Sequence, residues 1–120
     1  MYSGIEKRRF PRVQFPCKVS IMHKAPEILL THTENLGCGG MRLLIEKEIV
    51  VAQAVQVELF IGKKKKITAR AKVVWSMAIK NPCDQKTVLF DIGLEFIGIT
   101  DAYKAEIERL VYALMDKNHA

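Results

Sequence analysis

Cysteine is scarce in this chain, and the cysteines that are present form no pattern. The chain has three cysteines, Cys17, Cys38 and Cys83, which lie far apart in the sequence and include no C-x-x-C pair. A disulfide framework normally has an even number of cysteines, and a zinc site normally has closely spaced pairs. The three histidines are equally scattered along the chain. The sequence therefore predicts neither a metal site nor a disulfide scaffold.

Long apolar runs are also missing. No stretch approaches the roughly 20 apolar residues of a membrane-spanning helix, and no apolar signal-peptide core follows the basic N-terminus. We therefore expect a cytoplasmic protein without membrane insertion. The chain has 120 residues, of which 49% are hydrophobic and 27% are charged, which is typical of one globular domain.

The sequence also lacks the residue sets that are typical of catalytic sites. No histidine–carboxylate, cysteine–histidine or paired-carboxylate set occurs at a suitable spacing, and there is no nucleotide-hydrolysis motif. Asp91 and Glu95 share one face of an expected strand, where carboxylates are usually only solvated. The sequence favours a binding protein over an enzyme.

Positive charge, by contrast, is present in excess and is clustered. The net charge is +6, and Lys7-Arg8-Arg9-Phe10-Pro11-Arg12 holds four cations in six residues. Clustered positive charge favours an anionic partner, and the planar donors of arginine fit phosphate oxygens and the edge of a guanine. A second cluster, the four lysines at 63–66, is interpreted as the solvated tip of a hairpin.

Alternating apolar and polar residues predict six strands joined by short turns. The expected inward-facing residues are Phe15, Cys17, Val19 and Ile21, a weaker set within 27–34, then Met41, Leu43 and Ile45, then Val55, Val57, Leu59 and Ile61, then Ile67, Ala69, Ala71, Val73 and Trp75, and finally Val88, Phe90, Ile92, Leu94 and Phe96. Closure into an antiparallel barrel would remove the exposed edges of such a sheet. Trp75 is in phase with this inward pattern, so its ring is predicted to point into the core.

The period changes after residue 100. An apolar stripe at helical spacing consists of Tyr103, Ile107, Leu110, Val111 and Leu114. Thr100 or Asp101 would cap the start of this helix. We expect the stripe to pack against the barrel; the alternative is a partner-binding helix. The expected organisation is a flexible arm over residues 1–6 and one domain over 7–117, with the barrel at about 13–97 and the helix at about 101–117.

A glycine-rich stretch, Asn35-Leu36-Gly37-Cys38-Gly39-Gly40, lies as a turn between two of the expected strands. Glycines let the backbone approach a ligand closely. Together with the arginine cluster, this turn predicts a site for a compact, doubly charged nucleotide. In a straight strand Arg8 and Arg12 would lie about 13 Å apart, so we expect the arginine segment to bend and to become ordered when the ligand binds.

These two motifs resemble the signature of the PilZ domain family. Arg8-x-x-x-Arg12 is similar to the family's RxxxR, and Asn35-x-Gly37-x-x-Gly40 is similar to its [D/N]xSxxG. Val73-Val74-Trp75-Ser76 and Ile92-Gly93-Leu94-Glu95-Phe96 also match the family's later strands, so the resemblance extends from about residue 6 to 112. It implies a six-stranded antiparallel barrel with a C-terminal helix, acting as a bacterial receptor for cyclic di-GMP, the second messenger that controls motility, biofilm and pilus function.

The resemblance also implies which residues bind the ligand. Arg8 and Arg12 would contact phosphates and guanine edges, and Asn35 would bond a guanine edge. Gly37 and Gly40 would shape the turn against the ligand.

Basic neighbours of RxxxR often join the site in this family, which adds Lys7 and Arg9. A basic residue in the position of Lys7 is associated with an intercalated ligand dimer, so two ligands per chain are expected. Some family members stack a guanine on an aromatic residue, so contact with the ligand is the alternative to core packing for Trp75.

One position departs from the family pattern, because Gly37 replaces the family serine. The loss of a hydrogen bond to a charged group costs about 1.5–3 kcal/mol, roughly tenfold to a hundredfold in affinity. Backbone N–H groups of the turn would partly compensate. Two hypotheses follow: a receptor that signals to a protein partner by changing shape, and a degenerate adaptor for pilus or motility machinery that binds proteins without cyclic di-GMP.

A nucleic-acid-binding barrel is a third hypothesis, because the chain carries excess positive charge. Such a protein needs exposed aromatic residues on which bases stack. Phe60 alone is out of phase with the inward sets, so the sequence argues against this function.

Overall fold

A computed structural model of the chain describes residues 12–13, 17–24, 27–62 and 65–119. The flexible arm expected over residues 1–6 lies outside them. Within the described part of the chain, the only helix is too polar or too short in its apolar stretches to cross a membrane.

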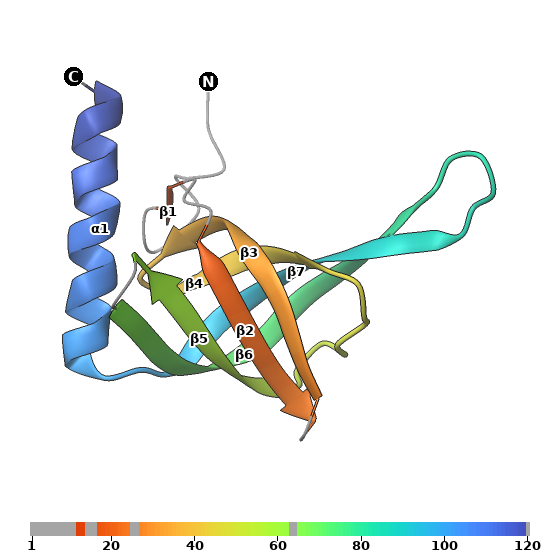
Figure 1. Cartoon of the computed structure of the whole chain (residues 1–120), viewed down its shortest axis with the longest axis horizontal. Coiled ribbons are helices and arrows are strands. Elements are labelled where there is room, and N and C mark those ends of the chain that lie inside the picture. The colour runs from red at the N-terminus through yellow and green to blue at the C-terminus, as the bar shows by residue number, and fades with distance from the viewer. Residues whose placement is uncertain (1–11, 14–16, 25–26, 63–64, 120) are drawn as a thin grey trace.

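Seven strands and one helix follow one another along the chain. They are β1 (Arg12–Val13), β2 (Lys18–Lys24), β3 (Glu27–Gly37), β4 (Gly40–Ile45), β5 (Ala54–Ile61), β6 (Lys65–Lys80), β7 (Thr87–Gly98) and α1 (Asp101–His119). The strand order is β1-β3-β2-β5-β6-β7-β4, and a further pairing of β3 with β4 closes β2 to β7 into a barrel (Figure 1). The predicted six-stranded antiparallel barrel with a C-terminal helix is confirmed, with β1 as a short addition beside β3.

The barrel interior is filled by the alternating residues that the sequence pattern predicted. Fully buried examples from five different strands are Ile21, Leu43, Leu59, Ile67 and Ile92. Cys17 is buried among them, as expected. Ile49 is also fully buried, although it lies in the connection between β4 and β5, where strand periodicity gives no signal.

Two of the predicted inward positions that the structure describes were wrong, and the prediction for Phe15 lies outside the described residues. Val73 pairs with Leu94, whereas Trp75 pairs with Gly93, so β6 contains one extra residue at this point. Such a bulge reverses the phase of the residues that follow it, and Trp75 is 38% exposed on the outer face. Val88 is exposed as well, because β7 pairs with β4 only from Phe90 to Glu95 and Val88 lies beyond that pairing. The β6–β7 hairpin extends away from the barrel (Figure 1).

Helix α1 packs against one end of the barrel, as predicted. Ile107 and Val111 are fully buried, and the helix lies next to β1 and β3. Thr100 caps the helix, because its Oγ1 accepts a hydrogen bond of 3.2 Å from the backbone N–H of Tyr103. An ion pair of 2.8 Å between Lys65 and Glu106 joins the helix to the start of β6.

Replacement of Gly40 tests how closely the strands approach at the start of β4. A Cβ at Gly40 would lie 1.9 Å from the carbonyl oxygen of Leu94, so Gly40→Ala must push β4 away from β7. We expect the free energy of unfolding to fall by about 2 kcal/mol or more, measured by chemical denaturation. Gly98→Ala is the control, because its Cβ would lie 3.4 Å from the nearest atom, Cβ of Arg70. Equal losses in the two variants would contradict this interpretation.

Candidate functional site

The structure describes four of the seven predicted ligand-binding residues: Arg12, Asn35, Gly37 and Gly40. The predictions for the other three, Lys7, Arg8 and Arg9, lie outside the described residues.

Strand β1 brings the end of the arginine cluster to the glycine-rich motif. Arg12 pairs with Gly37 in an antiparallel arrangement, and Gly37 pairs with Gly40 across the turn between β3 and β4. Gly40 in turn pairs with Glu95 of β7. Arg12, the last arginine of RxxxR, therefore belongs to one row across the sheet with Gly37 and Gly40 of the second motif.

The turn itself is tighter than the sequence suggested. Asn35 and Gly37 belong to β3, Gly40 begins β4, and only Cys38 and Gly39 form the turn. The carbonyl oxygen of Gly39 accepts a hydrogen bond of 2.8 Å from the backbone N–H of Phe96. The motif is thus held on three neighbouring strands and is not a free loop.

A second row of residues runs beside the first on the outer face of the barrel. Asn35 pairs with Arg42, Arg42 pairs with Gly93, and Gly93 pairs with Trp75. The register of β3 shifts between Thr33 and Asn35; Thr33 is buried in the interior, and the shift gives Asn35 an outer position. Strand bulges commonly re-aim a side chain in this way.

The indole of Trp75 lies directly over Gly93. A Cβ at Gly93 would come within 2.1 Å of the indole Nε1, so only glycine leaves room for the ring. One end of the second row is therefore an aromatic surface, and its other end is the amide of Asn35. Sequence periodicity placed Trp75 in the core because the bulge in β6 leaves no local signature.

Arg42 lies between these two ends and is held by Asp91. Its Nε and Nη2 atoms each donate a hydrogen bond of 2.8 Å to the carboxylate oxygens of Asp91. These hydrogen bonds raise the pKa of Arg42 above its ordinary value. The side chain of Asp91 is only 7% exposed, against 38% for Arg42. The expectation that Asp91 is merely solvated was wrong, and Arg42 is a fixed, partly accessible cation beside Asn35.

Cys38, at the tip of the turn, is buried against helix α1. Its Sγ lies 4.0 Å from Oε2 of Glu108, and burial, followed by the charge of Glu108, raises the pKa of the thiol. A neutral, buried thiol serves as a small packing residue. The turn is consequently in contact with the helix. Among the described residues no cluster of histidine, cysteine or carboxylate side chains is suited to hold a metal ion.

Comparison with known proteins adds a family and several solved folds. A family model described as "PilZ domain" matches residues 6–113. No curated protein sequence gives a significant match. The family match covers nearly the whole chain and includes both motif segments.

Among solved structures, the PilZ domain of Escherichia coli YcgR with c-di-GMP is similar, with a TM-score of 0.71, 18% identity, and coverage of 93% of this chain and 94% of that one. The Bacillus subtilis inhibitor of motility, MotI/DgrA, has a TM-score of 0.76 at 14% identity, with coverage of 94% and 53%. The K. pneumonia MrkH–c-di-GMP complex has a TM-score of 0.74 at 18% identity, with coverage of 93% and 54%. At these identities the likeness concerns the fold, and the chain spans about half the length of MotI/DgrA and MrkH.

Replacement of Arg42 tests its pairing with Asp91. Arg42→Met keeps the apolar stem but leaves a buried carboxylate without its cation, which we expect to lower the free energy of unfolding by about 2 kcal/mol. Denaturant titration measures the change. Arg109→Met is the matched control, because Arg109 is 69% exposed and pairs with Glu106 at the surface; its stability should stay close to that of the wild type. An Arg42→Met protein as stable as this control would contradict the role of the pair.

Proposed function

The chain belongs to the PilZ domain family, and from that premise we propose that it is a receptor for cyclic di-GMP. The observation that carries the proposal is the backbone pairing of Arg12 with Gly37, because it holds the last residue of the first motif beside the second motif. PilZ domains are ligand-binding or adaptor domains and not enzymes. Two proteins of similar fold, the YcgR domain and MrkH, have been solved with c-di-GMP.

The chemistry of the proposed ligand matches the two rows of the site. Cyclic di-GMP presents phosphate oxygens and guanine edges, and both are acceptors that the guanidinium fork of arginine binds. We assign Arg8 and Arg12 to these contacts, with Lys7 and Arg9 as further cations. Asn35 is assigned to a guanine edge, as the motif resemblance implies.

The second row extends the proposed site across the sheet. Asn35 and Trp75 lie three strand spacings apart, which is about 14 Å and suits a ligand with two bases. Arg42 lies between them as a fixed cation, and Trp75 offers a partly exposed ring on which a base stacks. We include both residues in the proposed binding surface for one or two ligand molecules.

Helix α1 is the proposed route of the signal. The turn between Gly37 and Gly40 contacts the helix through Cys38, and β1 lies against the same helix. A ligand that displaces β1 or the turn changes the helix surface offered to a protein partner. Because cyclic di-GMP is an intracellular bacterial messenger, we place this receptor in the cytoplasm. One similar protein is named an inhibitor of motility, which suggests motility as its output.

A ligand-independent adaptor is the second candidate function. The observation in its favour is Gly37, which lacks the hydroxyl of the family serine. Under this alternative the domain acts through protein contacts alone, in pilus or motility machinery.

Replacement of Arg12 tests the receptor proposal directly. Arg12→Ala removes a charged donor of the site, so we expect the Kd for cyclic di-GMP to rise at least tenfold. Calorimetric titration gives the affinity and the stoichiometry, and the emission of Trp75, the sole tryptophan, reports binding independently. Arg8→Ala should behave alike. Lys80→Ala, an exposed cation at the end of β6, is the control. Equal affinities for Arg12→Ala and Lys80→Ala would exclude the proposed site.

Restoration of the family serine separates the two candidate functions. Gly37→Ser supplies a hydroxyl donor, so we expect it to tighten binding by about tenfold to a hundredfold. Titrations at low salt compare it with the wild type. If the wild type gives no signal and Gly37→Ser binds, the adaptor function is favoured. If neither protein binds, the fold carries no nucleotide site.

A further inference from the structure

The outer face of β3, β2 and β5 carries apolar residues that are not part of the barrel core. We call Leu30, Ile28, Met22 and Phe60 the apolar patch. All four are exposed, and Leu30 is exposed to 80%. Outward positions of such a sheet are normally polar, because only the inward residues build the core. A gathered set of exposed apolar side chains marks an interaction site.

Strand register shows that the patch is bordered by cations. One row across the sheet consists of His32, Lys18, Phe60 and Lys66; the next of Leu30, Ser20, Glu58 and Thr68; the third of Ile28, Met22, Gln56 and Arg70. Positive charge therefore flanks the apolar patch in the first row and at the end of the third.

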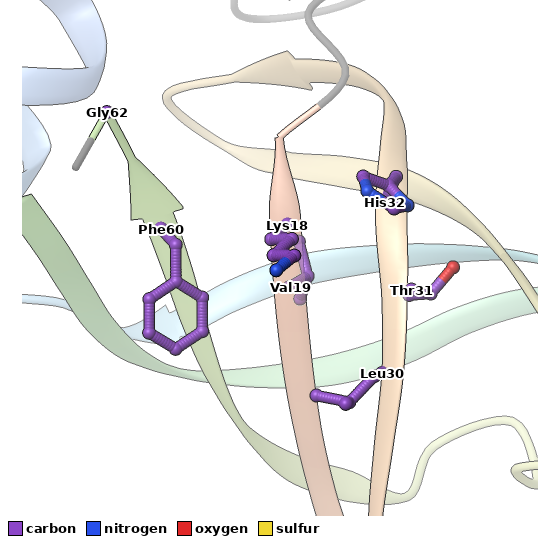
Figure 2. Close-up of a pocket in the computed structure, with 7 residues that line it drawn as sticks. All are labelled: Lys18, Val19, Leu30, Thr31, His32, Phe60 and Gly62. Atoms are coloured by element: carbon purple, nitrogen blue, oxygen red, sulfur yellow. The ribbon is translucent and has the colours of Figure 1, made fainter.

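A pocket of about 470 Å³ lies within this face. Its lining includes Lys18, Leu30, His32 and Phe60. Figure 2 shows Phe60 on β5 and Leu30 on β3 on either side of β2, with Lys18 between them. The pocket thus offers two apolar walls to a bulky side chain and an ammonium group to a carboxylate beside it.

The charges of this face are not balanced within the described part of the chain. Lys18 and Arg70 form no ion pair there, whereas Lys66 pairs with Glu58 at 3.1 Å. Glu58 also accepts a hydrogen bond from Ser20, so the carboxylate within the face is already engaged. Complementarity across interfaces places negative charge against such a surface.

We propose that this face docks an acidic, amphipathic segment of a protein partner. An apolar side chain of the partner enters between Phe60 and Leu30, and a neighbouring carboxylate pairs with Lys18. A second copy of this chain fits poorly, because a symmetric interface would bring the same cations together. Nucleic acid also fits poorly, because base stacking needs aromatic rings and three of the four patch residues are aliphatic. The proposal does not depend on cyclic di-GMP.

The probe for this face is a library of random twelve-residue peptides displayed on phage and selected on the immobilised full chain. We expect the enriched peptides to combine aspartate or glutamate with leucine or phenylalanine. Leu30→Ser and Lys18→Glu should each weaken binding of the synthesised consensus peptide at least tenfold. Raised salt should weaken it in the wild type, because charge pairing at a surface is screened.

Matched controls lie on the distant β6–β7 hairpin. Met77→Ser removes an exposed apolar side chain and Lys80→Glu reverses an exposed charge, so both should bind the consensus peptide as the wild type does. Circular dichroism confirms that each variant is folded. Leu30 is suited to replacement because its side chain contributes little to the core.

Three results would overturn the proposal. They are an absence of enriched peptides, a consensus without acidic residues, and binding that Leu30→Ser leaves unchanged. Parallel titrations use anionic phospholipid vesicles and a single-stranded oligonucleotide, and sedimentation reports self-association. Acidic peptides could fail to bind while Leu30→Ser abolishes vesicle binding, oligonucleotide binding or self-association. The face would then bind lipid, nucleic acid or a second copy of the chain instead. None of these experiments contains cyclic di-GMP, so a negative result here does not bear on the receptor proposal.

Discussion

Closure of the barrel through β4 is the constraint on which the rest of the structure depends. This strand pairs with β3 on one side and with β7 on the other, and its first residue approaches β7 so closely that a Cβ would collide with the backbone. The glycine-rich motif lies at this junction of β4 with β3 and β7, which we call the seam. Gly40 therefore has two roles: it allows β4 to approach β7 closely, and it belongs to the proposed nucleotide site. The arginine segment joins the seam through the pairing of Arg12 with Gly37.

Two irregularities in the strands determine which side chains face the proposed ligand. The shift after Thr33 gives Asn35 an outer position, and the extra residue at Val74 does the same for Trp75. Both residues then fall in one row with Arg42 and Gly93. Regular strands in both places would have directed the amide and the indole into the core. The second row of the site therefore depends on imperfections in the pairing.

The same irregularities explain where the sequence was a good guide and where it was not. Strict alternation predicted the barrel because buried residues such as Ile67 and Leu94 repeat every second position. It failed at Trp75, since one inserted residue reverses the phase without any mark in the composition. Ile49 was missed because it reaches the core from a connection. The buried state of Asp91 depends on Arg42, which lies 49 residues away, and only strand register reveals that partner.

The proposed nucleotide site and the apolar patch share β3. His32, which lines the pocket beside the patch, and Asn35 are three residues apart on this strand, so the two regions approach to about 10 Å. Two unit charges at that distance in water interact by roughly 0.4 kcal/mol, and physiological salt reduces this further. Coupling between two binding sites typically amounts to about 1–3 kcal/mol. The charge of a nucleotide at the proposed site is thus too small to control the proposed docking at the patch. Control would require a displacement of β3 itself, whose backbone pairs with β2 under the patch and with β1 and β4 at the seam.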